Sequence, residues 1–98
     1  MTSPIHVVHN EPEQRFEAIV DGRRSFASYR REGDVLYMVH TEVPREQRGS
    51  GIAAAVVQGA MDYAQAHGLK VAPVCSYVRA YLRRHPETAS VAVPGYAS

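Results

Sequence analysis

The spacing of apolar residues changes once along the chain, and this change limits the folds that the sequence can adopt. In the first half, apolar residues tend to alternate with polar ones, as at Phe16, Ala18 and Val20, which is the two-residue period of a β-strand. Between residues 51 and 67 they recur every three or four positions, which is the period of an α-helix. The sequence therefore predicts an α/β fold in which a strand-rich first half, of α+β character, precedes a long helix.

The first half divides into short strands. Strands are predicted over residues 5–9, 16–20, 24–31 and 35–43. Asp21-Gly22 is a strong hairpin signal and Glu32-Gly33-Asp34 supplies a second turn, so the last three strands form an antiparallel meander. The first five residues of 35–43 are apolar on both faces, which is typical of a central strand in a covered sheet.

The second half contains the helices. Gly68 suits the end of the long helix, residues 69–74 form a short strand, and a second helix over 76–84 stops before Pro86. Strand, helix and strand in this order give two parallel strands with a right-handed crossover. The prediction is a mixed, twisted sheet of about five strands with one long and one short helix. The tail, residues 87–98 with Val91, Val93 and Tyr96, either docks as a last irregular strand or frays.

The composition excludes several classes of protein. The 98 residues leave room for one domain, predicted over 1–98. A single cysteine cannot form an internal disulfide, and there is no secretory signal or membrane-length apolar run, so we expect a cytoplasmic location and no membrane partner. A net charge of +1 without a clustered basic face predicts no nucleic-acid partner. The five histidines lack metal-ligand spacing, so no metal site is expected.

A glycine-containing turn joins the strand at 35–43 to the long helix. Gly49 and Gly51 carry no Cβ atom, so a ligand can lie close to the backbone there. The start of the following helix presents unpaired N–H groups and a partial positive charge, and Arg48 adds a full one. This combination favours a phosphate or pyrophosphate as the ligand.

Two nucleotide-binding patterns overlap in this turn. Gly49-x-Gly51-x-x-Ala54 formally matches the dinucleotide fingerprint. That fingerprint needs an acidic residue about 20 positions further on to bind the ribose. The chain has no acidic residue between Tyr63 and Pro86, and it supplies too few parallel strands for a doubly wound domain. The context therefore disfavours a dinucleotide site.

The second pattern is Arg48-x-x-Gly51-x-Ala53. It resembles the Q/R-x-x-G-x-G/A motif of the GCN5-related N-acetyltransferases, which bind the pyrophosphate of acetyl-coenzyme A at a strand–turn–helix corner. The resemblance extends over most of the chain and is to the minimal, YjdJ-like members of that superfamily. It is carried further by the segments His40-Thr41-Glu42-Val43-Pro44, Gly68-Leu69-Lys70-Val71, Cys75-Ser76-Tyr77-Val78 and Tyr81-Leu82-x-x-His85-Pro86.

The resemblance implies that acetyl-coenzyme A, or coenzyme A, binds at this corner. The pantetheine arm would pair with the backbone near Thr41, Glu42 and Val43. The pyrophosphate would lie on the turn and the helix start, which comprise Arg48, Gly49, Ser50, Gly51, Ile52 and Ala53. Pro73 has no N–H group, so it either keeps the two parallel strands apart at the cofactor site or marks a sheet edge.

Two residues are candidates for the chemistry of acetyl transfer. Cys75 precedes a helix, where a thiolate is favoured, and could accept the acyl group and pass it to an amine; otherwise it is a small buried apolar residue. His40 could act as the base that activates the thiol or the amine, or it is an ordinary strand residue. Direct attack of the amine on the bound thioester is the other route, for which Glu42 is a further candidate base.

The second helix contributes residues with two interpretations. Arg79, Arg83 and Arg84 either contact the 3′-phosphate of the cofactor or form a solvated basic face. Tyr77 and Tyr81 are four residues apart, and we expect both to pack in the core with their hydroxyl groups near the surface.

Two hypotheses of different class follow. The first is an N-acetyltransferase that moves an acetyl group from acetyl-coenzyme A to an amine on a small molecule or a protein. The second is a non-catalytic module that binds or senses coenzyme A or acyl-coenzyme A. The resemblance implies that the chain lacks the helices that larger members of the superfamily place between their first strands, where they help to form the acceptor pocket. We therefore expect an open acceptor site, which either accommodates a large acceptor such as a protein amine or has no efficient acceptor. The sequence leaves the acceptor and the oligomeric state open.

Overall fold

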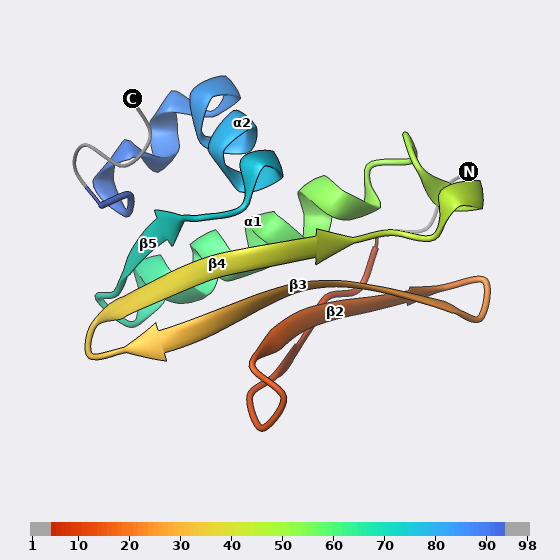
Figure 1. The fold of residues 1–98 in the computed structure, drawn as a ribbon, viewed down its shortest axis with the longest axis horizontal. Helices are drawn as coiled ribbons and strands as arrows, with labels where there is room; N and C mark the ends of the chain where they lie inside the picture. Colours follow the sequence, from red (N-terminus) through yellow and green to blue (C-terminus); the bar gives the residue numbers. More distant parts are fainter. Residues whose placement is uncertain (1–4, 94–98) are drawn as a thin grey trace.

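The computed structural model describes residues 5–93, whose five strands form one mixed sheet in the order β1-β2-β3-β4-β5 (Figure 1). The strands are β1 (Val8–Asn10), β2 (Arg15–Val20), β3 (Arg23–Glu32), β4 (Val35–Glu42) and β5 (Lys70–Pro73). β1 to β4 pair antiparallel, whereas β4 and β5 pair parallel. The predicted mixed sheet of five strands is confirmed.

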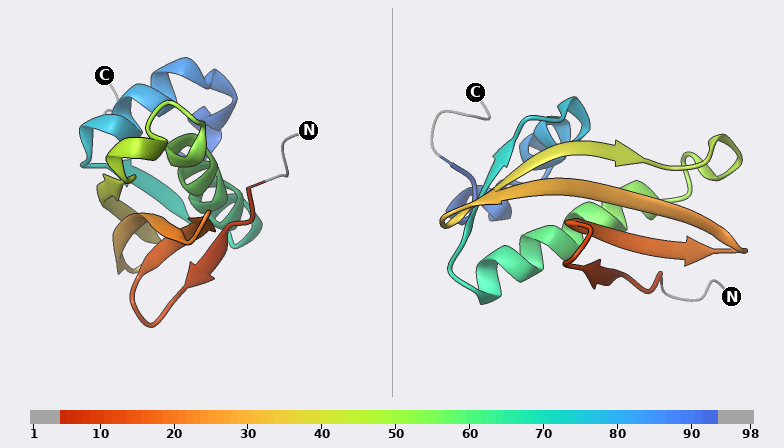
Figure 2. Two further views of the ribbon diagram at one scale, coloured as in Figure 1. Left: turned by 90° about the vertical axis from the view of Figure 1, so that its right-hand side faces the viewer. Right: turned by 60° about the horizontal axis from the view of Figure 1, so that its bottom comes forward.

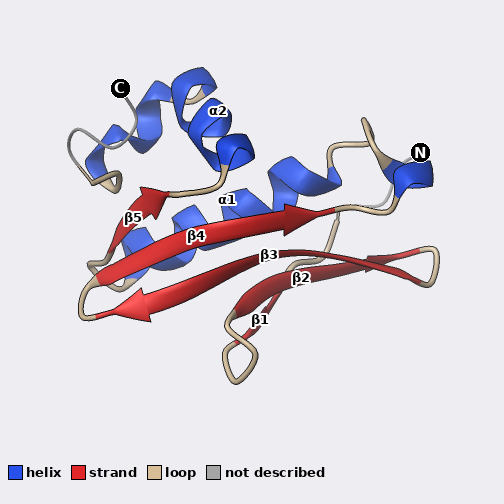
Figure 3. Ribbon diagram, viewed as in Figure 1, coloured by secondary structure: helices blue, strands red, loops and turns tan. Residues whose placement is uncertain are grey.

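Two α-helices follow the meander (Figure 3). They are α1 (Ile52–Ala66) and α2 (Ser76–Arg84), and the short 3-10 helices are η1 (Arg45–Gln47) and η2 (Pro86–Ser90). Gly68 adopts a φ of 67°, and the N–H of Leu69 donates to the carbonyl of Ala64 at 2.8 Å, which is the glycine-dependent helix ending expected there. Pro86 follows the end of α2, as predicted.

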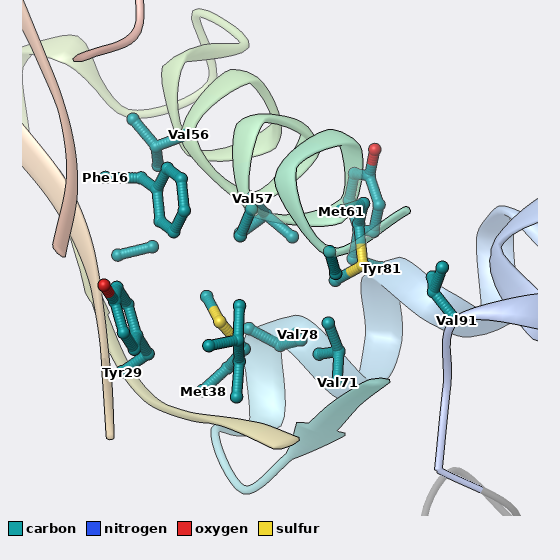
Figure 4. Packing of buried hydrophobic residues seen from close by; sticks show 14 of the residues in the cluster. Phe16, Tyr29, Met38, Val56, Val57, Met61, Val71, Val78, Tyr81 and Val91 are labelled. Carbon is teal, nitrogen blue, oxygen red and sulfur yellow. The ribbon is translucent and has the colours of Figure 1, made fainter. Parts of the chain in front are cut away.

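The hydrophobic core lies between one face of the sheet and the two helices. α1 packs against β2, β3, β4 and β5 along this face (Figure 2). Figure 4 shows Val57 of α1 and Val78 of α2 pointing into the same interior as Met38 of β4. Because both helices pack against one cluster, the opposite face of β4 stays open and Val39 is 37% exposed. The expectation that residues 35–43 are covered on both faces is therefore wrong.

The first strand begins later than predicted. Residues 5–9 were expected to be extended and paired, but β1 covers Val8–Asn10. Val7 instead lies over α1 at Gly59. A Cβ atom added to this glycine would be only 2.8 Å from Cγ1 of Val7. Packing on the helix therefore takes the place of sheet pairing for the start of this segment.

β4 contains a β-bulge at Val39. Tyr29 of β3 pairs with Met38 and Ser28 pairs with His40, so Val39 has no residue opposite it. The extra residue reverses the alternation of side chains beyond it. Val39 and His40 both lie on the open face, while Thr41 pairs with the fully buried Ala27 and therefore shares the core face.

β4 and β5 separate at their carboxyl ends. Their last paired residues are Met38 and Pro73, after which the N–H of Cys75 donates to the carbonyl of Met38 at 2.8 Å. β4 continues to Glu42, while β5 turns towards α2 (Figure 1). Pro73, the last residue of β5, thus stands where the two strands part.

The other edge of β5 pairs with the tail of the chain. The N–H of Val71 donates to the carbonyl of Val91 at 2.7 Å, and the N–H of Val93 donates to the carbonyl of Val71 at 2.9 Å. Val71 and Ala92 form a parallel bridge. The tail therefore docks as a short irregular strand up to Val93, and the predicted contribution of Tyr96 lies outside the described residues.

Candidate functional site

A cleft of about 490 Å³ lies beside the point where β4 leaves β5. Three segments form its walls: the end of β4, the turn that leads into α1, and the first turn of α2. Its lining residues are His40, Thr41, Glu42, Val43, Gln47, Arg48, Gly49, Gly51, Ile52, Ala53, Ala54 and Tyr77. Most residues predicted to bind the cofactor therefore line one cavity, which also includes Tyr77 of α2. Ser50 is absent from the lining, since its hydroxyl turns back to donate to the carbonyl of Gln47.

The turn before α1 depends on its two glycines. Gly49 and Gly51 have φ values of 83° and 89°, a region that side chains with a Cβ atom rarely adopt. A Cβ atom added to either one would meet nothing within 4 Å, so the space in front of this backbone is open. Gly51 is the N-cap of α1 and offers no side chain to its first N–H groups. These N–H groups and the helix dipole favour an anion at this place.

Neighbouring side chains hold the turn in position. Nε2 of Gln47 donates to the carbonyl of Val20 at 2.7 Å, which ties η1 to the end of β2. Arg23 and Glu46 form an exposed ion pair at 2.9 Å that joins the start of β3 to η1. Arg48 lines the cleft and forms no ion pair with another residue in the described range 5–93. Its charge is therefore available to a ligand.

The bulge in β4 separates the two predicted catalytic residues. Sγ of Cys75 donates to Oγ1 of Thr41 at 3.7 Å, on the core side of β4. His40 lies on the open side, where its Nε2 atom is 3.2 Å from Oε1 of Glu42. The two candidate bases, His40 and Glu42, thus contact each other, while Cys75 contacts Thr41.

Tyr77 is a lining residue that the sequence analysis missed. It was expected to pack in the core, but it is 36% exposed and faces the cleft. Partial burial raises the pKa of its phenol above the ordinary value, and the Arg84 charge opposes this effect. Tyr81, predicted in the same way, is buried and its hydroxyl donates to Oε1 of Gln58. The spacing alone could not distinguish the two, because the first turn of α2 also borders the cleft.

The arginines of α2 have different surroundings. The guanidinium of Arg79 donates to the carbonyls of Pro73, at 3.4 Å, and Val74, at 2.9 Å, so it closes the end of β5. Arg83 and Arg84 are exposed. Arg79 is thus committed to the backbone, which neither sequence interpretation anticipated.

Neither a metal-binding cluster nor a membrane-spanning helix is present among the described residues. Residues 5–93 contain no group of three or more His, Cys, Asp or Glu side chains arranged to hold a metal ion. In the same range, neither helix has the length and apolar character required to span a bilayer.

Comparison with known proteins places this geometry in a family. The sequence profile described as GCN5-related N-acetyl-transferase matches residues 15–91, which include β2 to β5 and both helices. The chain belongs to the GCN5-related N-acetyltransferase family. The match also spans every residue that lines the cleft, so the cavity is part of the family's domain.

The relatives found for this chain match it over most of its length. Protein NATD1 of Mus musculus is 31% identical over 86 residues, which are 85% of this chain and 78% of NATD1. Protein NATD1 of Xenopus tropicalis is 32% identical over 88 residues, which are 87% of this chain and 81% of NATD1. The solution structure of a GCN5-like protein from Staphylococcus aureus matches with a TM-score of 0.72 at 20% identity, covering 94% of this chain and 91% of that one. The last match confirms the predicted fold.

Proposed function

We propose that the chain binds acetyl-coenzyme A in the cleft and transfers the acetyl group to an amine. The observation that carries this proposal is a single cleft that joins the end of β4, where it has parted from β5, to the open glycine turn before α1. The chain's membership of the acetyltransferase family supports the reaction type. Small-molecule and protein amines are both accessible acceptors, because tight turns rather than helices connect β1, β2 and β3.

The residues present fit the proposed donor. The backbone of Gly49 and Gly51, with the first N–H groups of α1, would hold the pyrophosphate, and Arg48 would contribute its positive charge. Backbone groups of Thr41 and Val43 would receive the pantetheine arm along the edge of β4 that β5 leaves unpaired beyond Met38. When bound, acetyl-coenzyme A supplies the acetyl group as a thioester.

Cys75 offers a two-step route for the transfer. The Cys75 thiol would first lose its proton to water, and the thiolate would then attack the thioester carbon, so that an S-acetyl bond forms on Cys75 and the thiolate of coenzyme A leaves. The acceptor amine would then attack the acetyl carbon, lose a proton and restore the Cys75 thiolate. His40, which lines the same cleft as Thr41 and contacts Glu42, would take this proton. Thr41 would hold Sγ of Cys75 in place.

Binding and transfer are tested separately. Calorimetry with acetyl-coenzyme A is expected to show one site per chain. Intact-mass spectrometry after mixing is expected to show a gain of one acetyl group on Cys75, and this gain is expected to disappear when a lysine peptide or a polyamine is added as acceptor. No binding of acetyl-coenzyme A would overturn the proposed function.

The mass measurement also separates the routes. An unchanged mass together with an acetylated amine would support direct attack on the thioester. Binding without any acetylated product would leave the chain as a coenzyme A-binding module, which is the alternative function.

A further inference from the structure

The amino-terminal strand β1 is attached to the rest of the domain by few contacts. It lies at the edge of the sheet and pairs through three residues with β2 alone. The preceding Val7 contacts α1 at Gly59. Edge strands with so few backbone pairs open at a lower free energy than the core of a domain.

One side chain of β1 links it to three other elements. Nε2 of His9 is 2.6 Å from the hydroxyl oxygen of Tyr29 on β3. The His9 ring stacks on Phe16 of β2, with centroids 4.2 Å apart and planes 8° from parallel. Its edge meets Tyr63 of α1 at 4.4 Å. The imidazole thus packs among three aromatic rings, and these contacts attach β1 to the sheet and to α1.

The charged and titratable groups around His9 come from the turn after β1, from β3 and from α1 with its C-cap, whereas β2 contributes the uncharged ring of Phe16. Burial lowers the pKa of His9, and the nearby His67, the C-cap of α1, acts in the same direction. Glu11, in the turn after β1, opposes them. Burial also raises the pKa of Tyr29, so that hydroxyl stays neutral. Asp62 of α1 lines a groove that His9 also lines, but its carboxylate already accepts a hydrogen bond from Gln58 at 2.8 Å.

We propose that His9 is a pH-sensitive latch, which fastens β1 to the sheet while its ring is neutral and releases the strand when the ring is protonated. A neutral imidazole can accept a hydrogen bond from the Tyr29 hydroxyl at Nε2, whereas a protonated ring has N–H donors only, so this hydroxyl must reorient to become the acceptor. Release returns the charge to water, whereas retention leaves it among Phe16 and Tyr63.

The release is local because the other elements do not need β1. β2 to β5 remain paired with each other, and α1 keeps its contacts with all four strands. Release uncovers Phe16 and widens the groove of about 480 Å³ that Val7 and His9 share with α1. The sign follows from the lowered pKa of His9: docking of β1 is complete above its ordinary value of 6.5 and weakens as the pH falls below it.

Amide hydrogen exchange of the full chain tests this inference directly. Exchange at residues 8–10 is compared at about pH 7.5 and pH 5, after correction for the intrinsic effect of pH. Protection there is expected to fall by roughly tenfold for each unit by which the His9 pKa is lowered, while residues of β3 and β4 stay protected. Unchanged protection at residues 8–10, or equal loss across the whole sheet, would overturn the latch.

Two variants identify the responsible ring. His9→Phe keeps an aromatic ring that cannot be protonated, so β1 is expected to stay docked at both pH values. His85→Phe is the matched control, because His85 stacks on Tyr81 at 4.1 Å in a similar way on α2, and its response is expected to equal that of the natural chain. A pH response that persists in His9→Phe, or disappears in His85→Phe, would overturn the assignment to His9.

Discussion

The thiol of Cys75 donates a hydrogen bond to the hydroxyl oxygen of Thr41 at 3.7 Å, across the gap that opens between β5 and β4. This contact exists because the bulge at Val39 turns Thr41 to the core side of β4. Without the extra residue, His40 would follow Leu36 and Met38 onto that side. The bulge therefore decides which side chain of β4 faces the only cysteine of the chain.

Replacing Cys75 separates binding from transfer. Cys75→Ala is expected to lower the rate of acetyl transfer by at least about a hundredfold, because the two-step route loses its nucleophile. Its affinity for acetyl-coenzyme A is expected to stay close to that of the natural chain, because the residues proposed to hold the pyrophosphate and the pantetheine arm do not include Cys75. Initial rates and calorimetry measure the two effects. Thr41→Val keeps the side-chain volume and is expected to slow transfer less than Cys75→Ala does. If Cys75→Ala transferred acetyl groups as fast as the natural chain, the two-step route would be excluded.

The bulge can be tested through stability. By simple alternation Met38 and His40 would be equivalent, but Met38 is fully buried and His40 is exposed. Met38→Ala is expected to lower the free energy of unfolding by about 2–5 kcal/mol, as for large core truncations. His40→Ala is expected to change it by no more than about 0.5 kcal/mol. Urea denaturation measures both, and a large loss in His40→Ala would contradict the bulge.

Local signals in the sequence were sufficient to predict most of the fold. Asp21-Gly22 and Gly68 adopt positive φ values where turns were expected, and Pro86 follows the end of α2. These signals are reliable because each reflects a backbone conformation that few residue types allow. The glycine turn was recognised for the same reason.

Features that depend on distant partners were not predicted. The bulge at Val39 arises from the register between β3 and β4, and no glycine marks it. The exposure of Tyr77 depends on how α2 packs beside the cleft. The four-residue spacing to Tyr81 carries no information about this packing. The aromatic surroundings of His9 combine β1, β2, β3 and α1, so a strand histidine gave no sign of them.

Alkaline pH is expected to destabilise the domain through Tyr81. Burial raises the pKa of Tyr81, and the charges of Glu87 and Asp62 act in the same direction. A raised pKa means that the folded state favours the neutral phenol, so stability is kept below the ordinary value of 10.0 and is lost as the pH rises above it. Tyr81→Phe is expected to cost about 1 kcal/mol at neutral pH, where the hydrogen bond to Gln58 is lost, and to show a shallower loss above pH 10.0. Denaturation over this range measures the slopes, and identical slopes would contradict the prediction.

Gly51 provides a test of where the donor binds. Gly51→Val forces a β-branched residue into a φ of 89° and is expected to cost about 1–2 kcal/mol or more of stability. The added side chain meets no protein atom within 4 Å of its Cβ position, so it would occupy the space proposed for the pyrophosphate. Gly33→Val is the matched control, because Gly33 also has a positive φ but lies in the turn between β3 and β4. Calorimetry is expected to show loss of binding in Gly51→Val alone, and undiminished affinity there would show that the ligand lies elsewhere.

Arg48 tests the electrostatic part of the site. Its guanidinium lines the cleft and forms no ion pair within residues 5–93, whereas the nearby Arg45 is exposed and does not line the cleft. Arg48→Ala is expected to weaken acetyl-coenzyme A binding by roughly tenfold or more, the value of a charge-assisted hydrogen bond. Arg45→Ala removes the same charge and is expected to change the affinity less than threefold, as for a screened surface charge. Calorimetry at low and high salt measures both, with the difference between the variants narrowing as salt increases. An equal effect of the two substitutions would mean that net charge, rather than a contact made by Arg48, attracts the ligand.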